Sequence, residues 1–340
     1  MKILVVAPSW IGDTILAQPL LRLLKQQNPN TRIEVLAAGW SAPLLARMAE
    51  VDAVITNPFG HGEFNWTERR ALGRQLASAD FDAAYVLPNS WKSALVPFFA
   101  GIKQRIGYQG EARYLLLNQR HKLDTQRHPQ LVQRYAALAD VEASGTLRPH
   151  LTSSLEQQVA ARTALGLPLD SQPVVFCPGA EYGPAKRWPV SRFAELAQKV
   201  GVTEGNPCGT GDTAIWLIGS AKDREVGEEI VSLSGGKVLN LCGRTNLEQA
   251  IDLIAGARWM VSNDSGLMHV AAALGRPLTA LYGSSSPGYT PPLSADATIV
   301  TLNLPCSPCF KRECPLGHLD CLNLISAEQV ARSQPLCQPH

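Results

Sequence analysis

Short apolar strands alternate with helical stretches twice along this chain of 340 residues, and the alternation limits the possible folds more than any other feature. The first series opens with Lys2–Ala7, a β-branched run that Pro8 ends, and a helical apolar pattern follows from Asp13. The spacing then predicts strands at Arg32–Ala37, Val51–Thr56 and Phe81–Leu87, with helices at Ala42–Met48, Glu68–Ala77 and Ser90–Phe99. Strands and helices that alternate in this way form a doubly wound parallel sheet.

The same pattern restarts after a basic, Pro-punctuated stretch that contains the helical run Pro129–Ala139. The second series predicts strands at Pro173–Cys177, Ala214–Gly219, Ala257–Ser262 and Leu278–Tyr282, and helices at Ser191–Val200, Lys222–Leu233, Leu247–Ala255 and Ser265–Leu274. We therefore predict two α/β domains, residues 1–160 and 161–340, with a linker near residues 140–170. Thr203–Asp212, rich in Gly, Pro and Asn, is predicted to be an exposed loop.

Composition excludes several classes of protein. A hydrophobic fraction of 45% supplies two ordinary cores, and no apolar run approaches the roughly 20 residues that cross a bilayer. The apolar run after Met1 meets Pro8 and Asp13 too soon for a secretory signal, so we expect a cytoplasmic protein. Neither a P-loop nor a Gly-x-Gly-x-x-Gly fingerprint after a strand occurs, which argues against ATP hydrolysis and nicotinamide chemistry.

Basic residues concentrate in one segment although the net charge is only +2. Between residues 103 and 134 the acidic residues are Glu111 and Asp124. The basic residues of the segment are Lys103, Arg105, Arg113, Arg120, Lys122, Arg127 and Arg134. Such a segment is either a solvated surface or a contact for an anionic partner, and no nucleic-acid-binding motif accompanies it.

Two strand-to-helix turns carry residues suited to chemistry. Asp13 follows the first strand, where it serves either as a first-turn helix residue or as a general base at the carboxyl edge of the sheet. Asn263–His269 follows a later strand and opens a helix of small residues, which is either a capped helix start or a diphosphate site. In the second case His269 adds a charge-assisted bond to phosphate, and in the first it is ordinary packing.

Two further strand-end loops lie in the second series. Lys186 and Arg187 are two cations able to neutralise a diphosphate leaving group, or a solvated pair beside Trp188. In the loop that starts at Gly219, Asp223 or Glu225 accepts hydrogen bonds from a ribose or caps the next helix.

Four of the eight cysteines form a cluster with short spacings: Cys306, Cys309, Cys314 and Cys321. The spacing is compact enough for four thiolates to bind a structural zinc ion, although the middle interval is shorter than in zinc ribbons. Free thiols and, less readily in a reducing compartment, disulfides are the alternatives.

Long stretches of the chain resemble the ADP-heptose:lipopolysaccharide heptosyltransferases of glycosyltransferase family nine, and most closely their type II members. The stretches are Ala7–Asp13, Gly60–Gly62, Glu68–Arg70, Tyr85–Gly101, Arg113–Asn118, Cys177–Pro189, Gly219–Asp223, Asn263–His269 and Leu281–Pro287. The resemblance implies a GT-B fold, in which two Rossmann-like domains face a cleft with the acceptor on the first domain and the nucleotide sugar on the second.

The resemblance also implies roles for individual residues. Asp13 matches the general base and Lys186 a lysine that contacts phosphate or ribose. The remaining donor-binding residues implied here are Glu181, Tyr182, Arg187, Asp223, Thr245, Asp264, Ser265, Gly266, Leu267 and His269. The acceptor-binding candidates are Asn89, Lys92, Arg113 and Arg120. The cysteine cluster departs from the pattern of the family.

The implied activity is an inverting, metal-independent transfer of L-glycero-D-manno-heptose from ADP-heptose to the first heptose of the lipopolysaccharide inner core, heptosyl-Kdo2-lipid A. No cofactor is expected for catalysis, and contact with the inner face of the inner membrane is expected at the acceptor side. The alternatives are a sugar-nucleotide epimerase of the same fold and a protein that binds the core without turnover.

Overall fold

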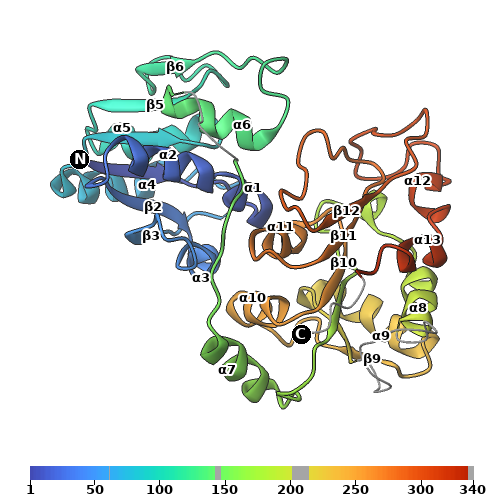
Figure 1. Ribbon diagram of the computed structural model, residues 1–340. Coiled ribbons are helices and arrows are strands. Elements are labelled where there is room, and N and C mark those ends of the chain that lie inside the picture. The colour runs from blue at the N-terminus through green and yellow to red at the C-terminus, as the bar shows by residue number, and fades with distance from the viewer. Residues whose placement is uncertain (61, 142–146, 201–213, 336–340) are drawn as a thin grey trace. The chain divides into compact units, whose positions relative to one another are not determined.

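Two compact units, Met1–His150 and Leu151–His340, make up the protein (Figure 1). The computed structural model describes residues 1–60, 62–141, 147–200 and 214–335, and the predicted loop Thr203–Asp212 lies outside them. The boundary between the units falls inside the predicted linker and before residue 160. Each unit is built on one six-stranded sheet in which every pairing is parallel, so the predicted pair of doubly wound sheets is confirmed.

The sheet of unit 1 has the strand order β3-β2-β1-β4-β5-β6. Its strands are β1 (Lys2–Val6), β2 (Arg32–Ala38), β3 (Ala53–Asn57), β4 (Ala83–Val86), β5 (Gln104–Tyr108) and β6 (Gln119–His121). Its α-helices are α1 (Ile11–Leu16), α2 (Gln18–Gln27), α3 (Ala42–Leu45), α4 (Trp66–Leu76), α5 (Leu95–Phe99) and α6 (Leu131–Ala136). Helices α4 and α5 pack together, and α1 and α2 both contact α6, so helices cover the two faces of the sheet (Figure 1).

The sheet of unit 2 has the strand order β12-β11-β10-β7-β8-β9. Its strands are β7 (Val174–Cys177), β8 (Ile215–Leu217), β9 (Val238–Asn240), β10 (Trp259–Asn263), β11 (Leu278–Leu281) and β12 (Ala297–Val300). Its α-helices are α7 (Leu155–Leu165), α8 (Val190–Lys199), α9 (Arg224–Leu233), α10 (Leu247–Ala255), α11 (Gly266–Ala273), α12 (Asp320–Asn323) and α13 (Ala327–Ala331). Helix α8 packs against α9 and α13, whereas α10 packs against α7 and α11 (Figure 1).

Burial explains why the central strands read as continuous apolar runs. Ile3, Leu4 and Val5 of β1 and Val174–Phe176 of β7 are almost entirely buried, because helices cover both faces of a parallel sheet. In unit 2 the core joins Phe176 of β7 to Phe193 of α8 and Ile230 of α9. None of the helices in the described ranges combines the length and the apolar composition needed to span a membrane.

Candidate active site

Each sheet has one point at which its strand order reverses. Several of the predicted site residues follow the two strands on either side of that point. In unit 2 the order reverses between β7 and β10, which are followed by Lys186 and Asp264 respectively. In unit 1 it reverses between β1 and β4, which are followed by Asp13 and by Asn89 with Lys92. Loops diverge at such a reversal, and open α/β sheets bind ligands in the crevice that forms at the carboxyl ends of the strands.

A buried ion pair lies at the reversal point of unit 2. The Nζ of Lys186 is 2.5 Å from Oδ2 of Asp264, whose residue is 5% exposed. The loop that carries Lys186 is fixed to the end of β10, because Oδ1 of Asn263 accepts a hydrogen bond from the backbone N–H of Trp188 at 3.0 Å. The Asn263 amide also donates to the carbonyl of Pro178 at 2.7 Å. The structure therefore brings the predicted Lys186 and Asp264 together and holds a cation at the edge of the sheet.

Helix α11 begins beside this pair without a side-chain cap. Its N-cap residue Ser265 has an extended backbone, and neither Ser265 nor Asp264 caps the helix through its side chain among the contacts described. The amides at Gly266 and Leu267 thus belong to a helix start that an anion can complete, with the positive end of the helix dipole behind them. This geometry favours the anion site over the capped helix start.

His269, one turn into α11, is buried among these groups. Burial lowers the pKa of the imidazole to about 4; the Asp264 carboxylate opposes this effect and the Lys186 ammonium adds to it. The imidazole is therefore neutral near pH 7. In these surroundings His269 offers a phosphate a neutral hydrogen bond, and the charge-assisted bond to phosphate stays a prediction.

The loop after β8 is built around the carboxylate of Asp223. Its Oδ2 accepts hydrogen bonds from the backbone N–H of Ser220 at 2.9 Å and from the Ser220 hydroxyl at 2.7 Å. A β-carbon at Gly179 would lie 2.5 Å from this carboxylate, so the loops after β7 and β8 touch there. Asp223 was predicted either to cap the next helix or to bind a ribose. The observed hydrogen bonds are those of the helix cap. Glu225 is exposed.

The remaining predicted donor residues lie along the same edge. Glu181 forms an exposed ion pair with Lys222. The Tyr182 ring lies beneath the ammonium of Lys186, 5.2 Å from the ring centroid. Thr245 is half-buried in the turn between β9 and α10, and the buried Nε of Arg187 has no hydrogen-bond partner in the described part of the chain.

The sequence predicts no role for Ser284 and Ser285, which the structure adds to this edge. Both follow β11, the neighbour of β10, and both hydroxyls are buried without a hydrogen-bond partner among the described residues. Buried hydroxyls usually have partners, so these two are available to a ligand. Their position directly after a buried strand was the signal that could have identified them.

In unit 1, Asp13 lies in the first turn of α1 and is half-buried. The buried Gly12 before it closes the turn from β1. Asn89 is exposed and Lys92 half-buried after β4, on the other side of the reversal point. Asp13, Asn89 and Lys92 thus follow the two strands between which the order reverses.

Arg113 and Arg120 have different surroundings. The Arg113 side chain is 2% exposed and donates to the carbonyls of Pro88 and Tyr108, each at 2.6 Å. Burial lowers its pKa to about 10. Direct contact between Arg113 and an acceptor does not fit this burial, and the residue instead joins the loops that follow β4 and β5. Arg120 is exposed, and its guanidinium lies 5.6 Å from the centroid of the Tyr114 ring.

An Asp-x-Asp pair, a motif that holds divalent ions in some glycosyltransferases, occurs at Asp80 and Asp82. It precedes β4 and therefore lies at the amino end of that strand, opposite the edge that carries Asn89. Asp82 accepts a hydrogen bond from the backbone N–H of Lys2 at 2.7 Å. The pair belongs to the start of the sheet and not to either candidate site.

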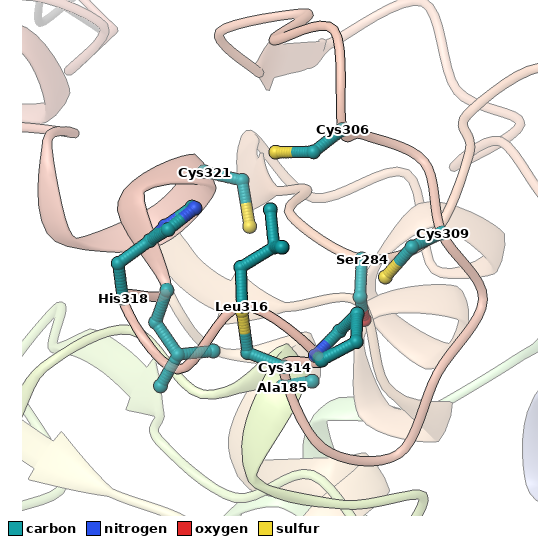
Figure 2. Close-up of a pocket in the computed structure, with 10 residues that line it drawn as sticks. Ala185, Ser284, Cys306, Cys309, Cys314, Leu316, His318 and Cys321 are labelled. Carbon is teal, nitrogen blue, oxygen red and sulfur yellow. The ribbon is translucent and has the colours of Figure 1, made fainter.

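The four clustered cysteines line one pocket together with Ala185, Ser284 and His318 (Figure 2). All four are free thiols. Cys306 is exposed, Cys321 is buried at the start of α12, and the other two are half-buried. In the described ranges no three His, Cys, Asp or Glu side chains are positioned as a group that could hold a metal ion, so the thiols surround the pocket without converging. Ala185 and Ser284 connect this pocket to the loops after β7 and β11.

Comparison with known proteins agrees with this geometry. The family model of glycosyltransferase family 9 (heptosyltransferase) matches residues 69–320. Lipopolysaccharide heptosyltransferase 2 of Escherichia coli K12 is 47% identical over 317 residues, covering 89% of this chain and 88% of that protein. Lipooligosaccharide heptosyltransferase 2 of Haemophilus influenzae is 48% identical over 320 residues, covering 89% of each. The solved structure of E. coli ADP-heptose lps heptosyltransferase II superposes with a TM-score of 0.85 at 42% identity, over 98% of this chain and 97% of that one.

Two parallel α/β units with ligand-type residues at both reversal points define an enzyme of the GT-B glycosyltransferase class. Within this class the chain belongs to glycosyltransferase family 9, the heptosyltransferases, and it is an enzyme that transfers a heptose. The predicted membership is confirmed, and the family decides against the sugar-nucleotide epimerase and the core-binding protein without turnover.

Proposed function

We propose that this heptosyltransferase moves L-glycero-D-manno-heptose from ADP-heptose to the first heptose of heptosyl-Kdo2-lipid A, with inversion at the anomeric carbon and without a catalytic metal. The observation that carries the proposal is the Lys186–Asp264 pair beside the uncapped start of α11, because it joins a fixed cation and free amides at one sheet edge. This combination suits a diphosphate and not a neutral ligand. The relatives named for lipopolysaccharide and lipooligosaccharide support the choice of acceptor.

In the proposed step, an acceptor hydroxyl oxygen attacks the anomeric carbon while Asp13 takes the hydroxyl proton. The bond from that carbon to the diphosphate oxygen breaks, and ADP leaves with the electron pair. Lys186 and the amides at Ser265 and Gly266 oppose the negative charge that grows on the leaving group. Asp264 acts as a positioning residue, since its carboxylate already holds the ammonium of Lys186.

Other residues of the donor edge take supporting roles in the proposal. Tyr182 lies against the ammonium of Lys186, and Arg187 follows it in the chain. Ser284 and Ser285 offer unpartnered hydroxyls to the donor, as judged from the described residues. Glu181, Asp223, Thr245, Leu267 and His269 shape the walls of the site. The four-cysteine pocket holds a structural zinc ion and supplies no reacting group to the transfer of the heptose.

The acceptor side of the proposal uses unit 1. Asn89, Lys92 and Arg120 are the polar residues left for the phosphates and carboxylates of the core, since Arg113 is buried. Lys92 and Asn89 follow the same strand, β4, at the reversal point that also carries Asp13. A cation and an amide beside the general base suit an anionic sugar acceptor.

Aromatic and basic side chains that contact one another in unit 1 form a surface that supports contact with a membrane. Trp66 stacks on Trp91 at 6.0 Å between ring centroids and meets Phe99 edge-on at 5.1 Å. Phe99 in turn contacts Phe98, above which lies the guanidinium of Arg105. Trp66 is 43% exposed, although aromatic rings of this size are usually buried more deeply.

The surface continues beyond Arg105, whose Nε donates to the carbonyl of Leu116 at 2.6 Å. The preceding Tyr114 and Leu115 project from their loop, and Leu115 is 87% exposed. Lys103 is exposed near this loop, since its carbonyl accepts a hydrogen bond from Asn118. Aromatic side chains and the exposed Leu115, interspersed with basic side chains, fit the interface of an anionic lipid bilayer. We therefore assign this surface to the inner face of the inner membrane, where a lipid A-linked acceptor would be met.

The transfer is tested by mass spectrometry with ADP-heptose and a defined acceptor series. One added heptose on heptosyl-Kdo2-lipid A, and none on Kdo2-lipid A, is the expected result. Transfer to Kdo2-lipid A alone would assign a different acceptor, and binding of the core without any added heptose would contradict the proposal.

Membrane contact is tested separately by co-sedimentation with vesicles of phosphatidylglycerol and phosphatidylethanolamine. Leu115→Glu should weaken binding about tenfold, since it places a carboxylate among buried acyl groups next to anionic lipid. The matched control is Leu155→Glu, at a leucine of α7 in unit 2 that is 77% exposed. Equal binding of both variants, or no binding of the wild type, would remove the membrane assignment.

A further inference from the structure

The segment from Cys306 to Cys321, called here the cysteine loop, has little apolar burial of its own. Phe310 is 50% exposed and Leu316 61% exposed, and the loop contains no strand. Fixing a segment of this length costs roughly 1 to 2 kcal/mol per residue in backbone entropy, which a small apolar contact area does not offset. A loop of this kind is ordinarily held by cross-links, either disulfides or a metal ion.

The four cysteine side chains point into the same pocket from different parts of the loop (Figure 2). Cys306 and Cys309 lie on its first part, Cys314 on a turn in its middle, and Cys321 at the start of α12. Among the described residues no acidic side chain lines the pocket, and its possible metal ligands are the four thiols and the imidazole of His318.

The turn at Cys314 directs backbone amides at its sulfur. The backbone N–H groups from Leu316 to Leu319 face this sulfur. The Gly317 N–H also closes the turn on the carbonyl of Cys314 at 3.1 Å. Hydrogen bonds from the backbone to a cysteine sulfur fix the orientation of a side chain that binds a metal ion.

The cysteine loop lies directly against the loop that carries Lys186. The hydroxyl of Tyr182 donates to the carbonyl of Phe310 at 2.9 Å, and the N–H of Ala185 donates to the carbonyl of Arg312 at 3.0 Å. A β-carbon at Gly183 would lie 2.5 Å from that same Arg312 oxygen, so the two backbones touch. Every contact is made one to four residues before Lys186.

The cysteine loop also contacts the strand end that carries Ser284. The N–H of Phe310 donates to the carbonyl of Ser284 at 2.7 Å, and the hydroxyl of Ser307 donates to the carbonyl of Gly283. One face of the loop therefore supports two parts of the donor edge. The shape of the cysteine loop determines where both parts lie.

We propose that the four cysteine thiolates bind one Zn²⁺ ion, and that the bound ion holds the cysteine loop against Tyr182–Lys186 so that zinc occupancy sets the affinity for the nucleotide. The inference rests on the proposed donor role of Lys186. Binding forms four Zn–S bonds, and each thiol releases its proton to solvent. The side chains turn inward as they bind, since they surround the pocket without converging. Four thiolates suit zinc, and they leave no open position for catalysis.

Metal content provides the first test. The full chain, purified without added metal, should contain about one zinc per molecule by elemental analysis, and Cys309→Ser and Cys314→Ser should each lose it. The matched control is Cys242→Ala, which removes a buried thiol outside the cluster and should retain the zinc. Less than about 0.2 zinc per chain, both as purified and after incubation with Zn²⁺, overturns the site, as do four cluster thiols that react freely or form disulfides in the folded protein.

ADP affinity provides the second test, and it needs no variant. Removing zinc with a strong chelator should weaken ADP binding about five- to tenfold by calorimetry, because Lys186 and the amides near it lose a fixed position, and adding Zn²⁺ back should restore it. Circular dichroism checks that the chelated protein stays folded. A zinc-free, folded protein with unchanged ADP affinity overturns the coupling.

The two proposals fail in different ways. Asp13→Asn should lower the rate of transfer by about 100-fold or more and leave both zinc content and ADP affinity intact, which reports on the proposed function alone. If ADP does not bind the zinc-loaded protein at all, the donor role of Lys186 is wrong and the inference is overturned with it.

Discussion

His269 should make the stability of unit 2 depend on pH in a range where carboxylates contribute little. Its folded pKa of about 4 lies below the ordinary value of 6.5, so the unfolded chain takes up the proton first as the pH falls. Stability is present above pH 6.5 and is lost between pH 6.5 and about 4. Proton linkage with these two values gives a loss of about 2 kcal/mol between pH 7 and pH 5.

The measurement is urea unfolding of wild type and His269→Gln at pH 7 and pH 5. Glutamine keeps a polar side chain of similar reach and does not titrate, so the wild type should lose about 2 kcal/mol more than the variant. Contributions common to both proteins, including those of unit 1, cancel in the difference. The result that refutes the reasoning is a wild-type loss equal to that of the variant.

Nuclear magnetic resonance titration of the imidazole separates the causes. Lys186→Met removes a cation that lowers the pKa and leaves the Asp264 carboxylate, so the pKa of His269 should rise from about 4. Asp264→Asn removes the opposing carboxylate, so the pKa should not rise. A rise in the second variant would show that the contacts of His269 differ from those described.

Four further results are expected. Asp13→Asn, nearly isosteric but unable to take a proton, should lower kcat by about 100-fold or more in the transfer assay while the ADP dissociation constant stays unchanged; collapse of ADP affinity would instead make Asp13 structural. Lys186→Ala should weaken ADP binding about tenfold or more by calorimetry. Brief EDTA treatment that leaves the cysteine-bound zinc in place should not change the rate, and a rate restored only by Mg²⁺ or Mn²⁺ would overturn the metal-free step. Gly183→Ala should raise the KM for ADP-heptose about fivefold, because the new β-carbon would lie 2.5 Å from the Arg312 carbonyl oxygen, whereas Gly39→Ala, with ordinary contacts only, should not.

The sequence predicts most of the inner strands and the edge strand β3, but it misses the inner strand β5 and the edge strands β6, β9 and β12. β1, β7 and β10 are buried on both faces and therefore read as apolar runs. β6, with the sequence Gln-Arg-His, is a three-residue edge strand that buries little and leaves no apolar pattern. β12, at the other sheet's edge, has exposed residues at its centre. Edge strands are defined by the backbone of their neighbour, which sequence periodicity does not record.

The site predictions also depend on whether a strand places the residue. Residues placed by a strand end, such as Lys186 and Asp264, come together because parallel strands all end at one edge of the sheet. Arg113 belongs to a basic segment. Charge alone does not indicate that its guanidinium is buried and donates hydrogen bonds to the carbonyls of Pro88 and Tyr108. Asp223 has a side chain fit for either a cap or a ribose contact, and only its hydrogen bonds to Ser220 distinguish them.

The position of the cysteine loop shows how far chain order can mislead. Cys306 to Cys321 follow all the donor stretches in sequence, which predicts a role in stability alone. In the sheet, however, β11 lies next to β10, and β10 next to β7. The cysteine loop contacts the strand end after β11, so only the end of β10 separates that contact from the end of β7. The hydrogen bonds from Tyr182 and Ala185 to Phe310 and Arg312 are the consequence. We therefore expect any ion that orders this loop to act also on the residues proposed to hold the nucleotide, because the N–H of Ala185 donates to the carbonyl of Arg312 and no room is left for a side chain at Gly183.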